Sequence, residues 1–178
     1  MTSKTDAGSI LVLSGPIGSG KTTVARELIA LLPSPVAYIE GDRFWSFYAK
    51  TENRGPTHQS FVTIMVSMTA AAVPFANSGS RVVLDFSMPP WFLPSAKKIA
   101  AVRDIPIDYV VIRPSERTCA DRAATRAEGR IADYSRHRDL YRSFDEVERH
   151  TLSDDSSSPG ETAASIVEGL NEGWFRLT

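Results

Sequence analysis

A glycine-rich turn directly follows a short apolar segment near the start of the chain. Residues 10–13 read Ile-Leu-Val-Leu, a continuous apolar run that is typical of a strand buried on both faces of a parallel sheet. Apolar residues then recur at helical spacing over 22–32, where Pro33 ends the pattern. The turn between them consists of Gly15, Pro16, Ile17, Gly18, Ser19, Gly20, Lys21 and Thr22. The chain is therefore restricted to folds in which a tight glycine turn joins a buried strand to a helix.

This turn has the complete pattern of a phosphate-binding loop. Its glycines permit a backbone geometry in which several N–H groups converge on a polyphosphate, at the positive end of the following helix. Lys21 is expected to reach the β- and γ-phosphates, and the Thr22 hydroxyl is expected to bind Mg²⁺. We therefore predict that all eight loop residues bind ATP, with Mg²⁺ as the second cofactor. Thr23 is included in the nucleotide-binding set, although its position also suits an ordinary helix residue.

Strand-like and helix-like segments alternate along the rest of the chain. Apolar runs predict further strands, and helical patterns separate them; the strands are expected at 36–39, 82–85, 107–112 and 150–153, and the helices at 43–50, 58–77, 94–103, 115–126, 134–149 and 161–171. This alternation implies a parallel sheet with right-handed crossovers. We predict a single three-layer α/β domain over residues 10–178, with five parallel strands in the order 2-3-1-4-5, preceded by a flexible tail over residues 1–9.

Composition excludes several classes of protein. The net charge of −1 argues against a protein built mainly to hold nucleic acid, which usually carries a broad basic excess. The one cysteine, Cys119, permits no internal disulfide, and residues 1–9 lack the apolar core of a secretory signal. The apolar stretch over residues 61–76 contains Pro74 and several polar residues, and we expect it not to span a membrane. These features predict a cytoplasmic protein.

A phosphate-binding loop alone does not say what happens to the phosphate. A GTPase would need an Asn-Lys-x-Asp guanine reader, which the sequence lacks, and an AAA-type ATPase usually has a strand that ends in Asp-Glu, whereas the third strand here ends in Asp85-Phe86. A small phosphotransferase needs an acceptor pocket and an arginine-rich cover. The rest of the sequence favours this third class.

The order of features resembles the nucleoside-monophosphate-kinase-like superfamily over residues 10–172. Within it, the chain is most similar to small-molecule kinases such as the shikimate and gluconate kinases and the chloramphenicol-phosphotransferase-like group. The resemblance implies a P-loop kinase fold, and an enzyme that transfers the γ-phosphate of Mg·ATP to a hydroxyl of a small molecule. It also implies an arginine-rich helical lid at about 122–138.

Two aspartates are candidates for the chemistry. Asp42 follows the second strand, where an aspartate of the resembled kinases meets the substrate hydroxyl as a base or an orienter; an ordinary helix N-cap is the alternative. Asp85 ends the third strand, where a carboxylate can hold a water of the Mg²⁺ shell; capping of the next loop is the alternative. Glu40 competes for the metal position and ranks lower. Arg43 either anchors an anionic acceptor or faces solvent.

Arginines concentrate late in the chain. Nine of the fifteen arginines lie between residues 113 and 149, a segment without lysine. Arg122 and Arg126 are spaced to share one helix face, and the resemblance implies that the first stacks on adenine and the second contacts the phosphates. Arg126 therefore joins Lys21 and Asp42 as a predicted catalytic residue, and Arg130 is a third candidate for the phosphates. A charged helical face held by ion pairs is the alternative.

The acceptor pocket is expected between the second and third strands. Its predicted lining is aromatic or apolar, and consists of Phe44, Trp45, Phe47, Tyr48, Phe86, Met88, Trp91 and Phe92. Such a lining suggests an acceptor with an apolar or ring-like body. Two alternatives stay open: a kinase of nucleotide or polynucleotide ends, and a non-catalytic ATP-binding regulatory module. The sequence leaves the identity of the acceptor and the oligomeric state open.

Overall fold

A five-stranded parallel sheet forms the centre of the molecule. The computed structural model describes residues 8–50, 57–127, 129–153 and 155–178. The strands are β1 (Ser9–Ser14), β2 (Val36–Glu40), β3 (Arg81–Asp85), β4 (Ile107–Ile112) and β5 (Thr151–Leu152). Their spatial order is β2-β3-β1-β4-β5, and every pair is parallel. The predicted fold class and strand order are confirmed.

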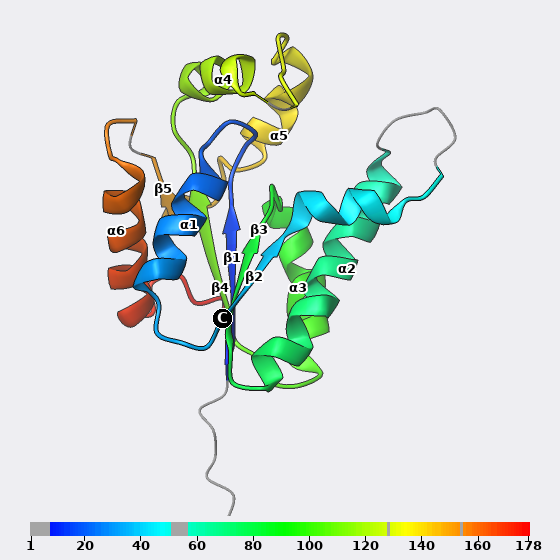
Figure 1. Cartoon of the computed structure of the whole chain (residues 1–178), viewed down its shortest axis with the longest axis vertical. Helices are drawn as coiled ribbons and strands as arrows, with labels where there is room; N and C mark the ends of the chain where they lie inside the picture. Colours follow the sequence, from blue (N-terminus) through cyan, green and yellow to red (C-terminus); the bar gives the residue numbers. More distant parts are fainter. Residues whose placement is uncertain (1–7, 51–56, 128, 154) are drawn as a thin grey trace, which may run out of the picture.

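Helices cover both faces of this sheet (Figure 1). One face carries α1 (Lys21–Leu31) and α6 (Pro159–Asn171), and the other carries α2 (His58–Asn77) and α3 (Leu93–Ala101). Because successive side chains of a strand point to opposite faces, Leu11 and Leu13 of β1 pack with α1 and α6, whereas Ile10 and Val12 pack with α2 and α3. All four are fully buried. This double burial explains why the first strand reads as an unbroken apolar run.

The chain between β4 and β5 lies beyond the carboxyl ends of the strands (Figure 1). It contains α4 (Glu116–Thr125), the 3₁₀ turn η3 (Ser135–His137), α5 (Arg138–Arg142) and the 3₁₀ turn η4 (Glu148–His150). The Ser115 hydroxyl caps α4 by accepting a hydrogen bond from the Thr118 amide, as the sequence suggested. The prediction of one helix over 134–149 is wrong. Phe144 is buried in the core beneath this segment, and its packing overrides the helical preference of the surrounding residues.

Two further 3₁₀ turns follow strands at this same edge. The first, η1 (Gly41–Phe47), directly follows β2, and the second, η2 (Pro90–Phe92), comes shortly after β3. The buried Ser14 hydroxyl at the end of β1 accepts a hydrogen bond from the Met88 amide and donates one to the Met88 carbonyl. The Tyr109 hydroxyl donates to that carbonyl as well. The segment after β3 is therefore fixed against the centre of the sheet.

The α2 helix is long and apolar enough to cross a membrane by length and composition alone, with a mean hydropathy of 1.4. The helix is longer than the apolar stretch over residues 61–76, which was predicted not to span a membrane. One of its faces nevertheless buries Ile64, Met65 and Met68 against the sheet. The core helix of a soluble protein passes the same test, and packing against the sheet accounts for part of the apolar character of α2, of whose most apolar window 33% is buried.

The described part of the chain begins at a buried residue. Ser9 is the first residue of β1 and pairs with Arg81, so the strand starts one residue before the predicted domain boundary. Residues 1–7 of the predicted tail lie outside the described residues. A single domain over 10–178 remains our proposal for the organisation of the chain.

Candidate active site

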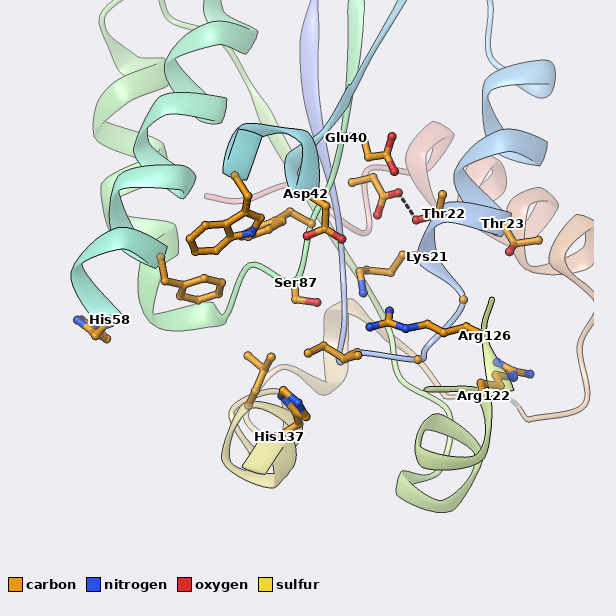
Figure 2. A pocket seen from close by; sticks show the side chains of 18 of the residues that line it. Lys21, Thr22, Thr23, Glu40, Asp42, His58, Ser87, Arg122, Arg126 and His137 are labelled. Atoms are coloured by element: carbon orange, nitrogen blue, oxygen red, sulfur yellow. Dashed lines mark hydrogen bonds between the residues drawn. The ribbon is translucent and has the colours of Figure 1, made fainter. Parts of the chain in front are cut away.

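One cavity of about 870 Å³ opens at the carboxyl edge of the sheet. Open α/β sheets place their ligands at this edge, and the volume lies in the range of small-molecule sites. The lining residues come from the glycine loop, α1, the ends of β2 and β3, η1, the start of α2, α4 and the segment after α4. They are Ile17, Gly18, Gly20, Lys21, Thr22, Thr23, Glu40, Asp42, Trp45, Thr57, His58, Phe61, Asp85, Phe86, Ser87, Arg122, Arg126, His137 and Leu140. Figure 2 shows Lys21, Asp42, Ser87 and Arg126 facing a common space.

The glycine loop could not be built from other residues. Gly18 has a φ of 82°, in the left-handed region, and a Cβ atom added to it would lie 2.1 Å from the Cys119 carbonyl oxygen. A Cβ atom on Gly15 would lie equally close to the Ile112 carbonyl oxygen. The loop therefore passes directly against β4 and α4, which fixes its position above the sheet.

Several polar groups of the loop fit an anionic ligand. The Gly20 residue at the start of α1 makes no side-chain cap, and the first turn of the helix has no acidic residue, so its positive end has no anion of its own. The buried Ser19 hydroxyl has no partner within the described chain. Lys21 donates to the carbonyl oxygens of Gly15 and Pro16, and burial is the main cause that lowers the pKa of its ammonium. A bound polyphosphate would supply the negative charge that this arrangement lacks.

The residues predicted to hold Mg²⁺ lie in contact. The Thr22 hydroxyl donates to the Asp85 carboxylate at 2.7 Å, and the Tyr38 hydroxyl donates to the same oxygen at 2.9 Å. Figure 2 marks the first of these bonds. Hydroxyl and carboxylate oxygens are ligands that Mg²⁺ accepts, while its remaining positions are usually filled by water and phosphate. Thr22 and Asp85 thus offer two oxygen ligands, and the described residues contain no cluster of three His, Cys, Asp or Glu side chains.

Asp42 is the second residue of η1 and faces Lys21 across the cavity (Figure 2). Asp42 is exposed to the cavity, and partial loss of hydration there is the main cause that raises the pKa of its carboxyl. The nearby Lys21 ammonium opposes the shift, whereas the negative charges of Asp85 and Glu40 add to it. Asp42 is thus a carboxylate with increased affinity for a proton, as a general base requires.

Glu40 and Arg43 form an ion pair of 2.7 Å beside Asp42. Glu40 lines the cavity, but Arg43 does not, and its side chain is largely exposed. Of the two alternatives for Arg43, the arrangement in this structure is the solvent-facing one.

The two predicted arginines both line the cavity, although they do not share a helix face. Arg122 lies in α4 and donates to the Ser19 carbonyl oxygen at 3.3 Å. Arg126 comes after the last residue of α4 and has an extended backbone, because the helix ends at Thr125. Its Nε atom donates to the Gly129 carbonyl oxygen at 2.6 Å. Arg130 does not line the cavity.

The predicted aromatic lining is only partly correct. Trp45 and Phe86 line the cavity. Met88 and Phe92 are instead core residues, and Phe47 is largely exposed to solvent. The remaining predicted residues also lie outside the lining; they are Phe44, Tyr48 and Trp91. A 3₁₀ turn places neighbouring side chains on different sides, so density of aromatic residues in the sequence did not predict which of them face the cavity.

Six lining residues on the acceptor side were not predicted from the sequence; they are Thr57, His58, Phe61, Ser87, His137 and Leu140. Spacing could have identified His58 and Phe61, which lie three residues apart at the start of α2 and so point to the same side. Ser87 follows the Asp85 strand end by two residues. His137 and Leu140 have no such local signal, because their position depends on the path of the chain after α4.

Comparison with known proteins identifies the domain. A family model described as an AAA domain, AAA_33, matches residues 10–147. No curated protein matches the chain in sequence. The strand end Asp85-Phe86, which lacks the Asp-Glu of an AAA-type ATPase, bears on the reaction, whereas the family match describes the domain.

Three solved structures illustrate the fold that the chain shares. The APS kinase CysC of Mycobacterium tuberculosis, in complex with AMPPNP and APS, is 19% identical with a TM-score of 0.69, and the match covers 93% of this chain and 98% of that one. The shikimate kinase of Acinetobacter baumannii, in complex with shikimate, is 17% identical with a TM-score of 0.67, covering 94% and 96%. The Pnkp1/Rnl/Hen1 RNA repair complex matches at 16% identity and a TM-score of 0.65, covering 88% of this chain and 53% of that one. The resemblance to P-loop kinases is confirmed at the level of the fold, and the chain belongs to the AAA domain family AAA_33.

Proposed function

We propose that the protein is a phosphotransferase that moves the γ-phosphate of Mg·ATP to a hydroxyl of a small molecule. The observation that carries this proposal is the joining of three groups in one cavity: the glycine loop with Lys21, the Thr22–Asp85 pair, and Asp42. A module that only binds ATP would not need a carboxylate with a raised pKa facing the phosphate lysine.

The nucleotide is held by the loop and the arginines in this proposal. Lys21 and the backbone N–H groups of the loop bind the β- and γ-phosphates, and Thr22 and Asp85 hold Mg²⁺. When bound, Mg²⁺ would neutralise charge on the phosphates. Arg126 stabilises the charge that develops on the transferred group, and Arg122 lies beside the loop where it can contact the nucleotide.

Asp42 accepts the proton of the acceptor hydroxyl. The acceptor oxygen forms a bond to the γ-phosphorus while the bond from that phosphorus to the β,γ-bridging oxygen breaks, so ADP leaves with the electron pair. Because burial raises the pKa of Asp42, the base is ionised only above that raised value. Activity should therefore fall as the pH drops through the pKa of Asp42.

The proposal is tested in two steps. Isothermal titration first measures whether the purified protein binds Mg·ATP, with Lys21→Met as the control. A screen of small alcohols, sugars and ring-bearing hydroxyl compounds then measures ADP release that depends on the acceptor. Tight ATP binding without stimulation by any acceptor would favour the regulatory module instead.

A kinase of nucleotide or polynucleotide ends is the second candidate. The fold shared with part of an RNA repair complex favours it, while the net charge of −1 does not. Oligonucleotides with a free 5′-hydroxyl belong in the same screen, and preferential turnover of these would select the second candidate. Under either candidate we place the protein in the cytoplasm, as the single cysteine suggests.

A further inference from the structure

The cavity has two ends of different chemistry. Figure 2 shows Arg122 and Thr23 at one end and His58 at the other, with Asp42 and Lys21 between them. Among the described lining residues, the lysine and arginine side chains are Lys21, Arg122 and Arg126. All three lie on or beside the glycine loop or follow α4.

These cations already have a ligand in the proposed function. Lys21 lies within the loop, and Arg122 contacts the carbonyl of Ser19 in that loop. Arg126 is close enough to Lys21 that its charge lowers the pKa of the lysine. Positive side chains held this close together are suited to a polyphosphate, which would pair with all three of them.

The acceptor end of the cavity is formed by an aromatic wall, which we define as Trp45, Phe61 and Phe86. The Phe61 and Phe86 rings pack with their centroids 5.4 Å apart, and the Trp45 ring stacks on Tyr48 at 6.3 Å. These contacts fix the rings in place before any ligand binds. Rigid aromatic surfaces of this kind favour a flat, apolar partner.

The polar side chains beside the aromatic wall include no lysine or arginine among the described residues; they are Asp42, Thr57, His58, Ser87 and His137. Ser87 lines the cavity, where its hydroxyl can bond to a ligand. Burial is the main cause that lowers the pKa of His137, and the charge of Arg126 lowers it further, so the protonated imidazole is disfavoured. Asp42 contributes a negative charge. Arg43, the cation nearest in sequence, pairs with Glu40 outside the lining.

We propose that the acceptor is an uncharged alcohol with an aromatic or similarly flat apolar body, which lies on the aromatic wall with its hydroxyl toward Asp42. This proposal rests on the proposed function, because it assigns the second substrate of the same site. A carboxylate or phosphate on the acceptor would lose its hydration against Trp45 and Phe61 without gaining a lysine or arginine partner among the described residues at this end of the cavity. It would also be repelled by Asp42 and by the γ-phosphate.

A matched pair of compounds tests the charge directly. The probes are 2-naphthalenemethanol and 6-(hydroxymethyl)-2-naphthoate, which share a ring system and a hydroxyl and differ in one carboxylate. Their binding to the full chain is measured by saturation-transfer-difference NMR, in the presence of Mg²⁺ and saturating AMPPNP. We expect the neutral compound to bind at least about tenfold more tightly, since an unpaired carboxylate is costly at an apolar surface.

The second part of the test introduces a positive charge into the aromatic wall. Phe61→Arg should shift the preference toward the carboxylate by about tenfold or more, because it supplies the missing cation. Trp45→Arg tests the same point from η1 in case Phe61→Arg does not fold. Phe75→Arg is the control: Phe75 lies on the same helix and is half exposed, about 20 Å away along the helix axis. It should leave the preference unchanged.

The outcomes separate this proposal from the proposed function. If AMPPNP itself does not bind, the proposed function fails, and the acceptor proposal fails with it. If AMPPNP binds but the naphthoate binds as tightly as the alcohol, or neither compound binds, only the acceptor proposal is overturned. Tighter binding of the neutral compound, with reversal in Phe61→Arg and not in Phe75→Arg, supports it.

Discussion

Replacement of Asp42 by asparagine separates the chemical role of this residue from its structural one. Asparagine keeps the shape of the side chain and caps a helix as well as aspartate does. It removes the carboxylate that faces Lys21 across the cavity. The N-cap residue of η1 is Glu40 and not Asp42. A purely structural role of Asp42 therefore predicts almost no change, whereas a role as a base predicts a large and specific loss.

The magnitudes follow from the surroundings of the carboxylate. Loss of a positioned general base lowers phosphotransfer by roughly 10²–10⁴, or about 3–5 kcal/mol in the activation free energy. Affinity for Mg·ATP should be unchanged or increased, because a negative charge near the γ-phosphate is removed. The raised pKa means that the ionised form is disfavoured in the folded state, so at pH 7 the variant should be as stable as the wild type or more stable. The stability cost of the carboxylate is present above the raised pKa and is lost as the pH falls through it.

Three measurements on one preparation check these directions. Acceptor-dependent ADP release gives the rate, isothermal titration gives the ATP affinity, and thermal unfolding gives the stability. The matched control is Asp104→Asn, since Asp104 is exposed, precedes β4, and has a positive φ that asparagine tolerates. A turnover within about threefold of the wild type would remove Asp42 from the proposed mechanism.

Three other substitutions test neighbouring parts of the site. Lys21→Met should weaken Mg·ATP binding by more than about tenfold, because it removes a positive charge from the phosphate loop. Circular dichroism should show an intact fold, because the charged form of Lys21 is already disfavoured in the protein. An unchanged ATP affinity would contradict the assignment of the loop. Tyr38→Phe removes one of the two donors to Asp85 and should raise the Mg²⁺ concentration for half-maximal activity about tenfold, measured by Mg²⁺ titration; an unchanged titration would show that Tyr38 does not position the carboxylate. Tyr134→Phe removes the 2.7 Å bond from Tyr134 to the Ile17 carbonyl and should cost about 1 kcal/mol of stability by denaturant unfolding. It should also speed hydrogen exchange at 122–138 in the absence of nucleotide, whereas equal exchange would argue against a lid held by this contact.

The fold was predictable from local patterns. The apolar runs that became β1, β3 and β4 are buried, and such burial leaves a clear signature in sequence, whereas the edge strand β2 is only partly buried. Helix α2 begins at His58 and ends at Asn77 as predicted, because Thr57 caps its start and Gly79 follows its end. The segment over 134–149 was not predictable in this way, since burial of Phe144 divides it into short turns.

The site was predictable where residues belong to a strand end. Thr22 and Asp85 meet because β1 and β3 are adjacent and parallel, so their carboxyl ends coincide. The acceptor side depends on which face of η1 and α2 is presented to the cavity, and neighbouring residues such as Trp45 and Phe47 differ completely in exposure. Arg126 lines the cavity as predicted, but the predicted reason, a helix face shared with Arg122, is wrong. Arg126 follows the last residue of α4 and does not lie on a face of that helix.

The destination of the γ-phosphate is the most direct test of the proposed function. The protein is incubated with Mg²⁺, ATP labelled with ¹⁸O in the γ-phosphate, and the acceptor that gives the highest ADP release. The products are then separated and analysed by mass spectrometry. If the protein is a phosphotransferase, the labelled phosphoryl group appears on the acceptor oxygen in an amount equal to the ADP formed. Label found only in inorganic phosphate would contradict the account, because water and not a bound hydroxyl would then be the acceptor.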